Sequence, residues 1–356
     1  MLEERSRRKE EHLAAVRRLP DGPRSPGWED IQLLPCCLPE LAWDEVDLST
    51  RLGGHELASP FLINAITGGS PQGLELNATL GRLARELGMA MAVGSQTAAL
   101  RDSALEESFR VARRENPEGV ILANLSAGAT LEEARRAVAM LNADMLQLHL
   151  NAAQELAMPE GERDFRGWSE HIRGIASGLA VPLAVKEVGF GMAAEEAVRL
   201  AGLGVRVVDV GGAGGTNFVA VEAARRGAPA GDSLLNWGLP AAVSLLEVLD
   251  AVGEQVEVVA SGGIRDGVAA GKALAAGACA VGVAGPLVRA LARGGAQEAR
   301  RYLVGLMEEL RTVMVLTGSR SLWDLRQRPF LVLGDTAEAL RRRGVDLDRY
   351  ARRGSI

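Results

Sequence analysis

The stretch Val256-Glu-Val-Val-Ala-Ser-Gly-Gly-Ile-Arg-Asp-Gly267 decides the fold of this chain. Its first half is a short apolar run, which is typical of a strand buried on both faces of a parallel sheet. Two glycines break the run, and a helical pattern follows around Ala269 to Ala276. A strand, a glycine-rich loop and a helix make one β/α unit, and the sequence repeats that unit on both sides of this stretch.

Seven more apolar runs share this character, and apolar residues spaced three and four apart lie between them, as in Leu76, Leu80, Leu83 and Leu87. The runs occupy residues 61–65, 91–95, 120–124, 145–150, 182–186, 205–210 and 279–283. Eight β/α units predict a (β/α)8 TIM barrel of the α/β class. An open doubly wound sheet is the alternative, but the pattern reaches eight units without a break in composition.

Two regions follow from this pattern. Residues 1–50 are predicted to form an N-terminal arm, and residues 51–356 the barrel with a C-terminal helical extension that closes it.

Composition excludes several classes of protein. The formal net charge of −6 argues against a general nucleic-acid surface. No uncharged apolar run reaches the roughly 18 residues of a membrane span, and the first twelve residues lack the apolar core of a signal peptide. Three cysteines are too few for a disulfide framework, so we expect a cytoplasmic, reduced protein.

The barrel predicts where a phosphate binds. In this fold the phosphate site commonly follows strands seven and eight, where Gly262-Gly263 and Ala284-Gly285 begin the loops before two helices. Exposed backbone N–H groups at helix starts attract phosphate. Thr216 follows strand six and can add a hydroxyl. Lys186 ends strand five, where a buried cation needs an anionic partner.

These groups, with amides and hydroxyls at the ends of strands one to three, suit a planar phosphorylated cofactor such as FMN. A phosphorylated sugar substrate remains the alternative.

The heptapeptide His149-Leu-Asn-Ala-Ala-Gln-Glu155 follows the fourth apolar run. Its histidine, two carboxamides and carboxylate can bind an anion, orient a proton and hold a hard cation. Because catalytic groups of a TIM barrel lie at the carboxyl ends of its strands, this segment is a candidate active site.

Several motifs together resemble the type 2 isopentenyl-diphosphate isomerases, in order along the whole chain. They are Arg8-Lys-Glu-Glu-His12, Ala65-Ile-Thr-Gly-Gly69, Val93-Gly-Ser-Gln96, the heptapeptide 149–155, Val185-Lys-Glu-Val-Gly-Phe-Gly191, Gly211-Gly-Ala-Gly-Gly-Thr-Asn217 and Ala260-Ser-Gly-Gly-Ile264. That family interconverts isopentenyl diphosphate and dimethylallyl diphosphate with FMN, Mg²⁺ and a reducing nucleotide, for which we expect NADPH. The resemblance also suggests a homo-oligomer, a tetramer or an octamer.

The resemblance implies roles for individual residues. Flavin contacts would come from Ile66, Thr67, Gly68, Ser95, Asn124, Lys186, Thr216, Gly262, Gly263, Ile264, Ala284 and Gly285. Substrate contacts would come from Arg8, Lys9, His12, Ser95, His149, Asn151 and Gln154, with Gln154 catalytic and Glu155 binding Mg²⁺. The sequence departs from the family at Ile66, often methionine there, and at Ala152-Ala153, where bulkier residues are usual.

A carboxamide does not titrate near neutrality, so Gln154 alone is a poor general base. The flavin requirement of the family motivates the hypothesis that reduced FMN is the acid and base, with N5 nearest the alkene and Gln154 orienting the exchange.

Two other classes of function compete: a different barrel enzyme, of which two kinds are considered, and a non-catalytic binding barrel. An FMN-dependent oxidoreductase resembling the α-hydroxy-acid oxidases would need a histidine late in the barrel, and no histidine follows His171. An IMP-dehydrogenase-like enzyme would need a loop cysteine between strands six and seven, where residues 218–255 have none. A non-catalytic phosphate-binding barrel gives no reason for Gln154-Glu155 to lie near Lys186.

Overall fold

Eight parallel strands close into a barrel in the computed structural model, which describes residues 2–227 and 232–354 and, of these, the side chains of all but residues 2–8 and 232. The strands are β4 (Phe61–Ile63), β5 (Ala90–Ala92), β6 (Ile121–Ser126), β7 (Met145–Leu150), β8 (Leu183–Glu187), β9 (Val207–Asp209), β10 (Glu257–Ser261) and β11 (Ala280–Val283). Each coincides with one of the eight predicted runs to within a few residues.

The barrel closes between its last and first strands. Val281 pairs with Phe61 and Val283 pairs with Ile63, and every neighbouring pair around the ring is parallel. The prediction of a TIM barrel is therefore confirmed, and the open sheet is excluded.

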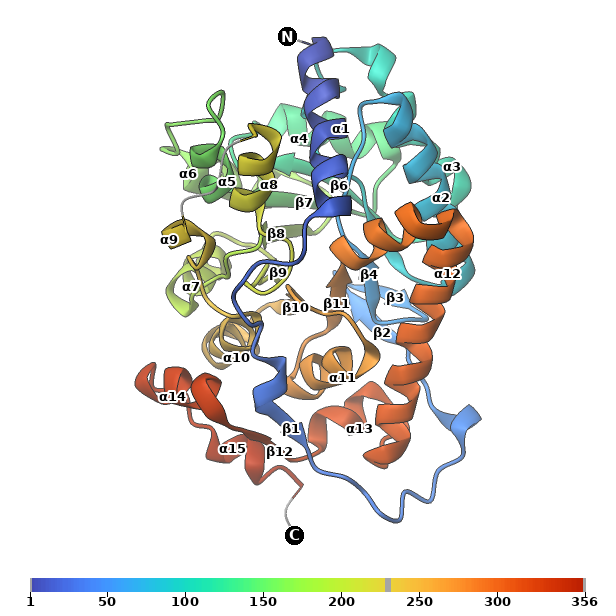
Figure 1. The fold of residues 1–356 in the computed structure, drawn as a ribbon, viewed down its shortest axis with the longest axis vertical. Helices are drawn as coiled ribbons and strands as arrows, with labels where there is room; N and C mark the ends of the chain where they lie inside the picture. The colour runs from blue at the N-terminus through green and yellow to red at the C-terminus, as the bar shows by residue number, and fades with distance from the viewer. Residues whose placement is uncertain (1, 228–231, 355–356) are drawn as a thin grey trace.

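Helices surround the barrel, as Figure 1 shows. The ring and its connections contain α2 (Pro71–Leu87), α3 (Glu107–Glu115), α4 (Leu131–Leu141), α5 (Ala152–Ala157), α6 (Trp168–Gly178), α7 (Ala194–Gly202), α8 (Phe218–Arg225), α9 (Asp232–Leu235), α10 (Ala241–Val252), α11 (Gly267–Ala276) and α12 (Gly285–Leu316), with short 3-10 turns at Trp28–Asp30, Trp43–Glu45, Gln96–Ala98 and Ser103–Leu105. Local sequence sets their limits: Thr130 and Glu133 form a capping box at the start of α4, and Asn142 ends that helix in a left-handed conformation. No described helix is long and apolar enough to cross a membrane.

A hairpin covers one end of the barrel. Its strands are β2 (Thr50–Leu52) and β3 (His55–Leu57), whose leucines Leu52 and Leu57 pack into the apolar interior beside Leu62 and Met145. The backbone N–H of Gly53 donates to Glu257 Oε2 at 2.6 Å, at the first residue of β10. The amino ends of the strands are thereby covered, and the opposite end is left as the mouth.

The N-terminal arm extends along the outside of the barrel. Its helix α1 (Leu2–Arg18) contacts α8 and α12 of the same chain at the mouth, at the top of Figure 1. Its strand β1 (Ile31–Leu33) pairs antiparallel with β12 (Phe330–Val332), near the bottom of Figure 1. Beside this pair lie the C-terminal helices α13 (Leu322–Gln327), α14 (Gly334–Arg342) and α15 (Asp348–Ala351). The arm thus runs from the mouth along the outside of α11 to the C-terminal segment, and the division at residue 50 stays a prediction.

Candidate active site at the barrel mouth

A cavity of about 680 Å³ lies at the carboxyl ends of the strands, beneath α1. Gly68 does not line it, and the side chain of Arg8 lies outside the described residues. The predicted site residues that line it are Lys9, His12, Ile66, Thr67, Ser95, Asn124, His149, Asn151, Gln154, Glu155, Lys186, Thr216, Gly262, Gly263, Ile264, Ala284 and Gly285.

Glycines shape the part of the cavity next to β10 and β11. Gly262 has a φ of 106°, and a Cβ there would lie 2.1 Å from the carbonyl oxygen of Gly212. A Cβ at Gly285, the first residue of α12, would lie 2.6 Å from Thr216 Oγ1. The backbone N–H groups of Gly262, Gly263 and Gly285 donate to no other group among the described residues, so they are available to a bound molecule. These loops therefore form a cradle with the geometry and donors that a phosphate needs.

Two buried oxygen atoms in the cavity wall also have no partner among the described residues. They are Thr67 Oγ1 and Asn151 Oδ1. Because a buried polar atom without a hydrogen bond costs free energy, these two positions indicate places where a bound molecule completes the site.

Polar side chains, three of which line the cavity, form a continuous series of hydrogen bonds inside the barrel. His149 Nδ1 lies 3.0 Å from Asn124 Oδ1, and Asn124 Nδ2 donates to Gln147 Oε1 at 2.8 Å. Gln147 Nε2 donates to Asn64 Oδ1 at 3.2 Å, and Asn64 Nδ2 donates to Asp209 Oδ2 at 2.6 Å. Side chains from four different strand ends thus hold one another in fixed orientations.

Lys186 lies in register between His149 on β7 and Asp209 on β9. Its Nζ is 3.9 Å from Asp209 Oδ2 and also donates to the carbonyl oxygen of Glu187. The expected anionic partner of this lysine is therefore present within the protein, and the ammonium group still lines the cavity.

His149 is neutral at physiological pH. Burial, together with the positive charges of Lys186 and Lys9, lowers its pKa to about 4. The imidazole can therefore exchange hydrogen bonds in the cavity without carrying a charge.

Helix α5 places Gln154 and Glu155 at the cavity. Asn151 Nδ2 donates to Glu155 Oε1 at 2.9 Å, and the backbone N–H of Glu162 donates to Glu155 Oε2 at 2.8 Å. Arg163 donates to the backbone carbonyl groups at the end of this helix, including that of Leu156 at 2.8 Å. No group of three or more potential metal ligands occurs among the described histidine, cysteine and acidic residues. A cation at Glu155 would therefore need ligands from substrate and water.

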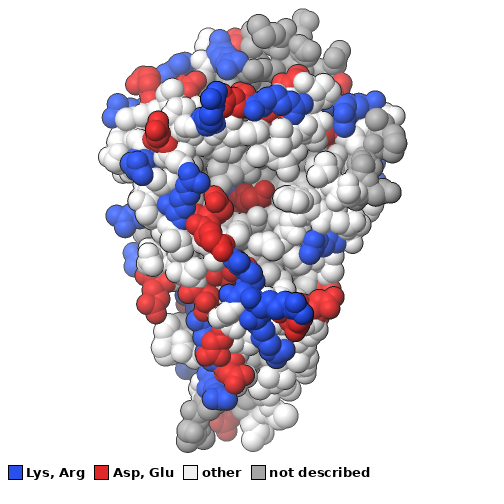
Figure 2. Space-filling model, turned by 90° about the vertical axis from the view of Figure 1, so that its left-hand side faces the viewer, with Lys and Arg blue, Asp and Glu red and all other residues white. Residues whose placement is uncertain are grey.

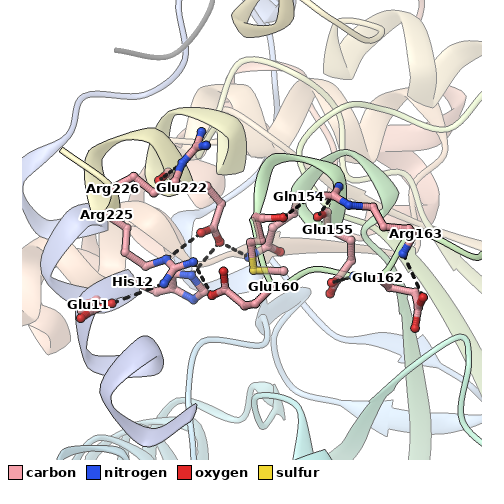
Figure 3. Close-up of polar contacts among 11 residues, drawn as sticks. Glu11, His12, Gln154, Glu155, Glu160, Glu162, Arg163, Glu222, Arg225 and Arg226 are labelled. Carbon is pink, nitrogen blue, oxygen red and sulfur yellow. Dashed lines mark hydrogen bonds and ion pairs between the residues drawn. The ribbon is translucent and has the colours of Figure 1, made fainter. Parts of the chain in front are cut away.

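Glu222 on α8 joins three parts of the site, as Figure 3 shows. Its fully buried carboxylate accepts from Gln154 Nε2 at 3.0 Å and from Arg225 Nε at 2.8 Å, and its Oε1 lies 2.7 Å from His12 Nε2. Burial would raise the pKa of Glu222, but the contacts with His12, Gln154 and Arg225 outweigh it and lower the pKa to about 2. The carboxylate is therefore ionised and fixes both the arm and Gln154.

Lys9 on α1 also reaches the strand ends. Its Nζ donates to the carbonyl oxygens of Gly68, at 2.5 Å, and Ser95, at 3.0 Å, and lies 5.1 Å from the centre of the Phe109 ring. The arm therefore closes over the barrel of its own chain. Gly68 contributes through this carbonyl group, although it does not line the cavity.

Glu222, Asp209 and Gln147 were not predicted as site residues, and Asn64 was expected only as one of the amides at the strand ends. Asp209 carried a signal, since a carboxylate within the apolar run 205–210 must have partners. Glu222 carried a similar signal, since it lies in the apolar stretch 218–224, but it lies in a helix and not at a strand end, where site residues were sought.

The molecular face in Figure 2 carries interspersed acidic and basic side chains, with no broad field of one sign among its described residues. It therefore offers no extended cationic surface for a nucleic acid.

Comparison with known proteins places the chain among flavin enzymes. A family model described as FMN-dependent dehydrogenase matches residues 99–331. Proteins named isopentenyl-diphosphate delta-isomerase are similar over nearly the whole chain. The one from Moorella thermoacetica is 49% identical, covering 93% of this chain and 95% of its own. The one from Symbiobacterium thermophilum is 49% identical and covers 98% of each. The one from Bacillus licheniformis is 42% identical, with 98% and 99% covered.

Solved structures with the same fold are more distant in sequence. A putative lactate oxidase from Pediococcus acidilactici superposes with a TM-score of 0.67 at 20% identity, covering 91% of this chain and 87% of the other. A mandelate oxidase variant superposes with a TM-score of 0.63 at 22% identity, covering 90% and 92%. At these identities the likeness supports the fold alone.

Proposed function

The chain belongs to the FMN-dependent dehydrogenase family and, within it, to the isopentenyl-diphosphate delta-isomerases, and we propose that the groups around its cavity share the work of that isomerisation. The enzyme interconverts isopentenyl diphosphate and dimethylallyl diphosphate, and its cofactor is FMN.

One observation carries the proposed arrangement. A single cavity contains two separate regions suited to anions: the glycine cradle at β10 and β11, and the side of α1 that carries Lys9 and His12. The cradle fits a cofactor phosphate, held by Gly262, Gly263 and Gly285 with the Thr216 hydroxyl. The arm fits the substrate diphosphate, with Lys9, His12 and, by its place in the sequence, Arg8 as hydrogen-bond donors to it.

The remaining flavin contacts are proposed from the walls of the same cavity. Lys186 would place its positive charge beside the ring, and the unpartnered Thr67 hydroxyl would donate to it. The other contacts would come from Ile66, Gly68, Ser95, Asn124, Ile264 and Ala284. When bound and reduced, FMN supplies a group that can both give and take a proton without net redox change.

The chain's own residues orient that exchange. Glu222 accepts from Gln154 Nε2, which turns the carbonyl oxygen of Gln154 away from Glu222 and fixes its carboxamide at the cavity wall. Because Glu222 is ionised, it holds Gln154 and does not itself deliver a proton at neutral pH. His149, Asn151 and Ser95 would complete the contacts with the substrate.

Mg²⁺ is proposed to bind at Glu155. Mg²⁺ is commonly held by one or two carboxylates, substrate phosphate oxygens and several waters, and Glu155 is a carboxylate whose orientation Asn151 fixes. We further propose NADPH as the reductant of the flavin, a homo-oligomeric enzyme of four or eight subunits and a cytoplasmic location, as expected from the resemblance and the composition.

An α-hydroxy-acid oxidase activity is less supported. The isomerases match at up to 49% identity, whereas the oxidases match at 20–22%. The last histidine of the chain is His171, so the late barrel offers no histidine as a base for hydroxy-acid oxidation.

The decisive experiment is an isomerase assay on the purified FMN-loaded protein. The oxidised protein should be yellow and bleach with dithionite or NADPH, and the reduced protein should convert isopentenyl diphosphate to dimethylallyl diphosphate when Mg²⁺ is present. Reduced 5-deaza-FMN should give no turnover. NADPH consumption in proportion to product would identify a reductase, and full activity with 5-deaza-FMN would exclude the acid/base proposal.

A further inference from the structure

An unbroken series of hydrogen bonds runs from His149 on β7 through the interior of the barrel to Asp209 on β9. The order is His149, Asn124, Gln147, Asn64 and Asp209. The three amide residues and Asp209 are each only 1–2% exposed. Because water does not reach these groups, each amide must match its donor and acceptor to its neighbours.

Asp209 fixes the direction of this chain of hydrogen bonds. Its Oδ1 accepts from the Ser261 hydroxyl and from the backbone N–H of Gly211, at 3.1 Å for the latter. Its Oδ2 faces Asn64 Nδ2 and the Lys186 ammonium group. A carboxylate surrounded only by donors acts only as an acceptor, so Asn64 must turn its NH2 group towards Asp209.

The orientation of Asn64 then passes from one amide to the next. With its NH2 group on Asp209, Asn64 presents Oδ1 to Gln147 Nε2, and the backbone N–H of Ala65 supports the same orientation at 3.0 Å. Gln147 in turn presents Oε1 to Asn124 Nδ2. Asn124 is left with its carbonyl oxygen facing His149 Nδ1.

We propose that Asp209 is a positioning residue that sets the tautomer of His149 through Asn64, Gln147 and Asn124. A carbonyl oxygen only accepts, so Nδ1 of His149 carries the proton. In the neutral imidazole, Nε2 is then a bare acceptor, and no described residue donates to it. The cavity therefore presents a lone pair at this position and not an N–H.

This tautomer determines what His149 can bind, an inference that rests on the proposed substrate. Nε2 repels an unprotonated phosphate oxygen, since both atoms are acceptors. His149 would therefore contact the diphosphate through a proton donor, and a water on a Mg²⁺ held by Glu155 would have the required O–H groups.

Nitrogen-15 NMR of the histidine rings tests the tautomer without substrate or turnover, so its outcome is independent of the proposed reaction. The FMN-loaded enzyme is labelled in its four histidines, and the His149 signals are identified by their loss in His149→Gln. We expect a neutral ring protonated at Nδ1. In Asp209→Asn the residue at 209 can donate as well as accept, so the His149 signals should shift towards the Nε2-protonated form.

Three further variants distinguish a change in the donor and acceptor order of these hydrogen bonds from a general loss of local structure. Ser261→Ala removes one donor to Asp209 but keeps the Asp209–Asn64 contact, and should leave the tautomer unchanged. Asn64→Leu removes the hydrogen bonds that residue 64 makes with Asp209 and Gln147, and it should shift the tautomer of His149 as Asp209→Asn does. Adding Asn124→Asp to Asp209→Asn places an acceptor-only group beside His149 and should restore the Nδ1 proton. An Nε2-protonated ring in the wild type, or an unchanged ring in Asp209→Asn, would overturn the proposal.

Discussion

His12 Nε2 lies 2.7 Å from Oε1 of Glu222, and this contact fastens the N-terminal helix to a fully buried carboxylate on α8. The same Oε1 atom accepts from Gln154 Nε2. One charge therefore controls two features of the site, the closure of the arm and the orientation of Gln154. A change in that charge should affect both.

Replacing Glu222 with glutamine tests this dependence. Glutamine keeps the size of the side chain but removes the charge and can turn an NH2 group towards Gln154 Nε2. Because misorientation of a catalytic group costs large factors in rate, we expect kcat for the isomerisation to fall by roughly 10². FMN content, followed by visible absorbance, should stay close to that of the wild type.

Glu160→Gln is the matched control. Glu160 also pairs with Arg225, whereas the hydrogen bond of Gln154 Nε2 goes to Glu222 (Figure 3). We expect its kcat to change less than about threefold, as for a partly exposed ion pair. Equal losses in Glu160→Gln and Glu222→Gln would assign the effect to Arg225 and not to Gln154.

Glu222 should also make the protein sensitive to acid. Its pKa falls from 4.5 to about 2 on folding, so the folded state favours the ionised form. This stabilisation is present above pH 4.5, is lost as the pH falls towards 2, and corresponds to about 3 kcal/mol. Urea unfolding of wild type and Glu222→Gln at several pH values should show a stability difference that shrinks over this interval. A constant difference would contradict the pKa.

The barrel was predictable because each of its strands corresponds to a short apolar run in the local sequence. The run 145–150 coincides with β7, and the run 182–186 with β8, since a strand buried on both faces needs consecutive apolar residues. The positions of the strand ends followed from the fold, and they brought His149 and Lys186 into register on neighbouring strands.

Glu222 could not be predicted in the same way. Its neighbours Val221 and Ala223 are apolar and imply burial, but its partner His12 is 210 residues away and no local pattern identifies it. The environment of Glu222 exists only once α1 folds over the mouth. Asp209 is an intermediate case. The surrounding valines implied that it is buried, but its hydrogen bond with Asn64 forms only because closure of the barrel brings the two residues together.

Glu155→Gln tests the proposed metal site. Glutamine can still accept from the backbone N–H of Glu162, so the loop should keep its structure. The neutral amide is a weaker ligand for Mg²⁺ than a carboxylate. We expect the Mg²⁺ concentration for half-maximal activity to rise by roughly tenfold to a hundredfold. Unchanged Mg²⁺ dependence in this variant would remove Glu155 from the metal site.

The glycine cradle makes a prediction about cofactor binding that needs no substrate. In Gly285→Ala the new Cβ would lie 2.6 Å from Thr216 Oγ1, closer than real Cβ contacts allow. The shift that relieves this contact would disturb the start of α12, where we place the FMN phosphate. We expect the Kd for FMN, measured by flavin fluorescence, to rise about tenfold or more, which is about 1.4 kcal/mol.

Gly305→Ala in the same helix is the matched control, because a Cβ at Gly305 would meet nothing within 4 Å. Alanine is the better helix former, so this variant should bind FMN like the wild type, with an equal or slightly higher Tm. If Gly285→Ala binds FMN as tightly as Gly305→Ala, the phosphate does not lie at the start of α12. If both variants lose FMN, the loss reflects the helix as a whole and the cradle has no specific role.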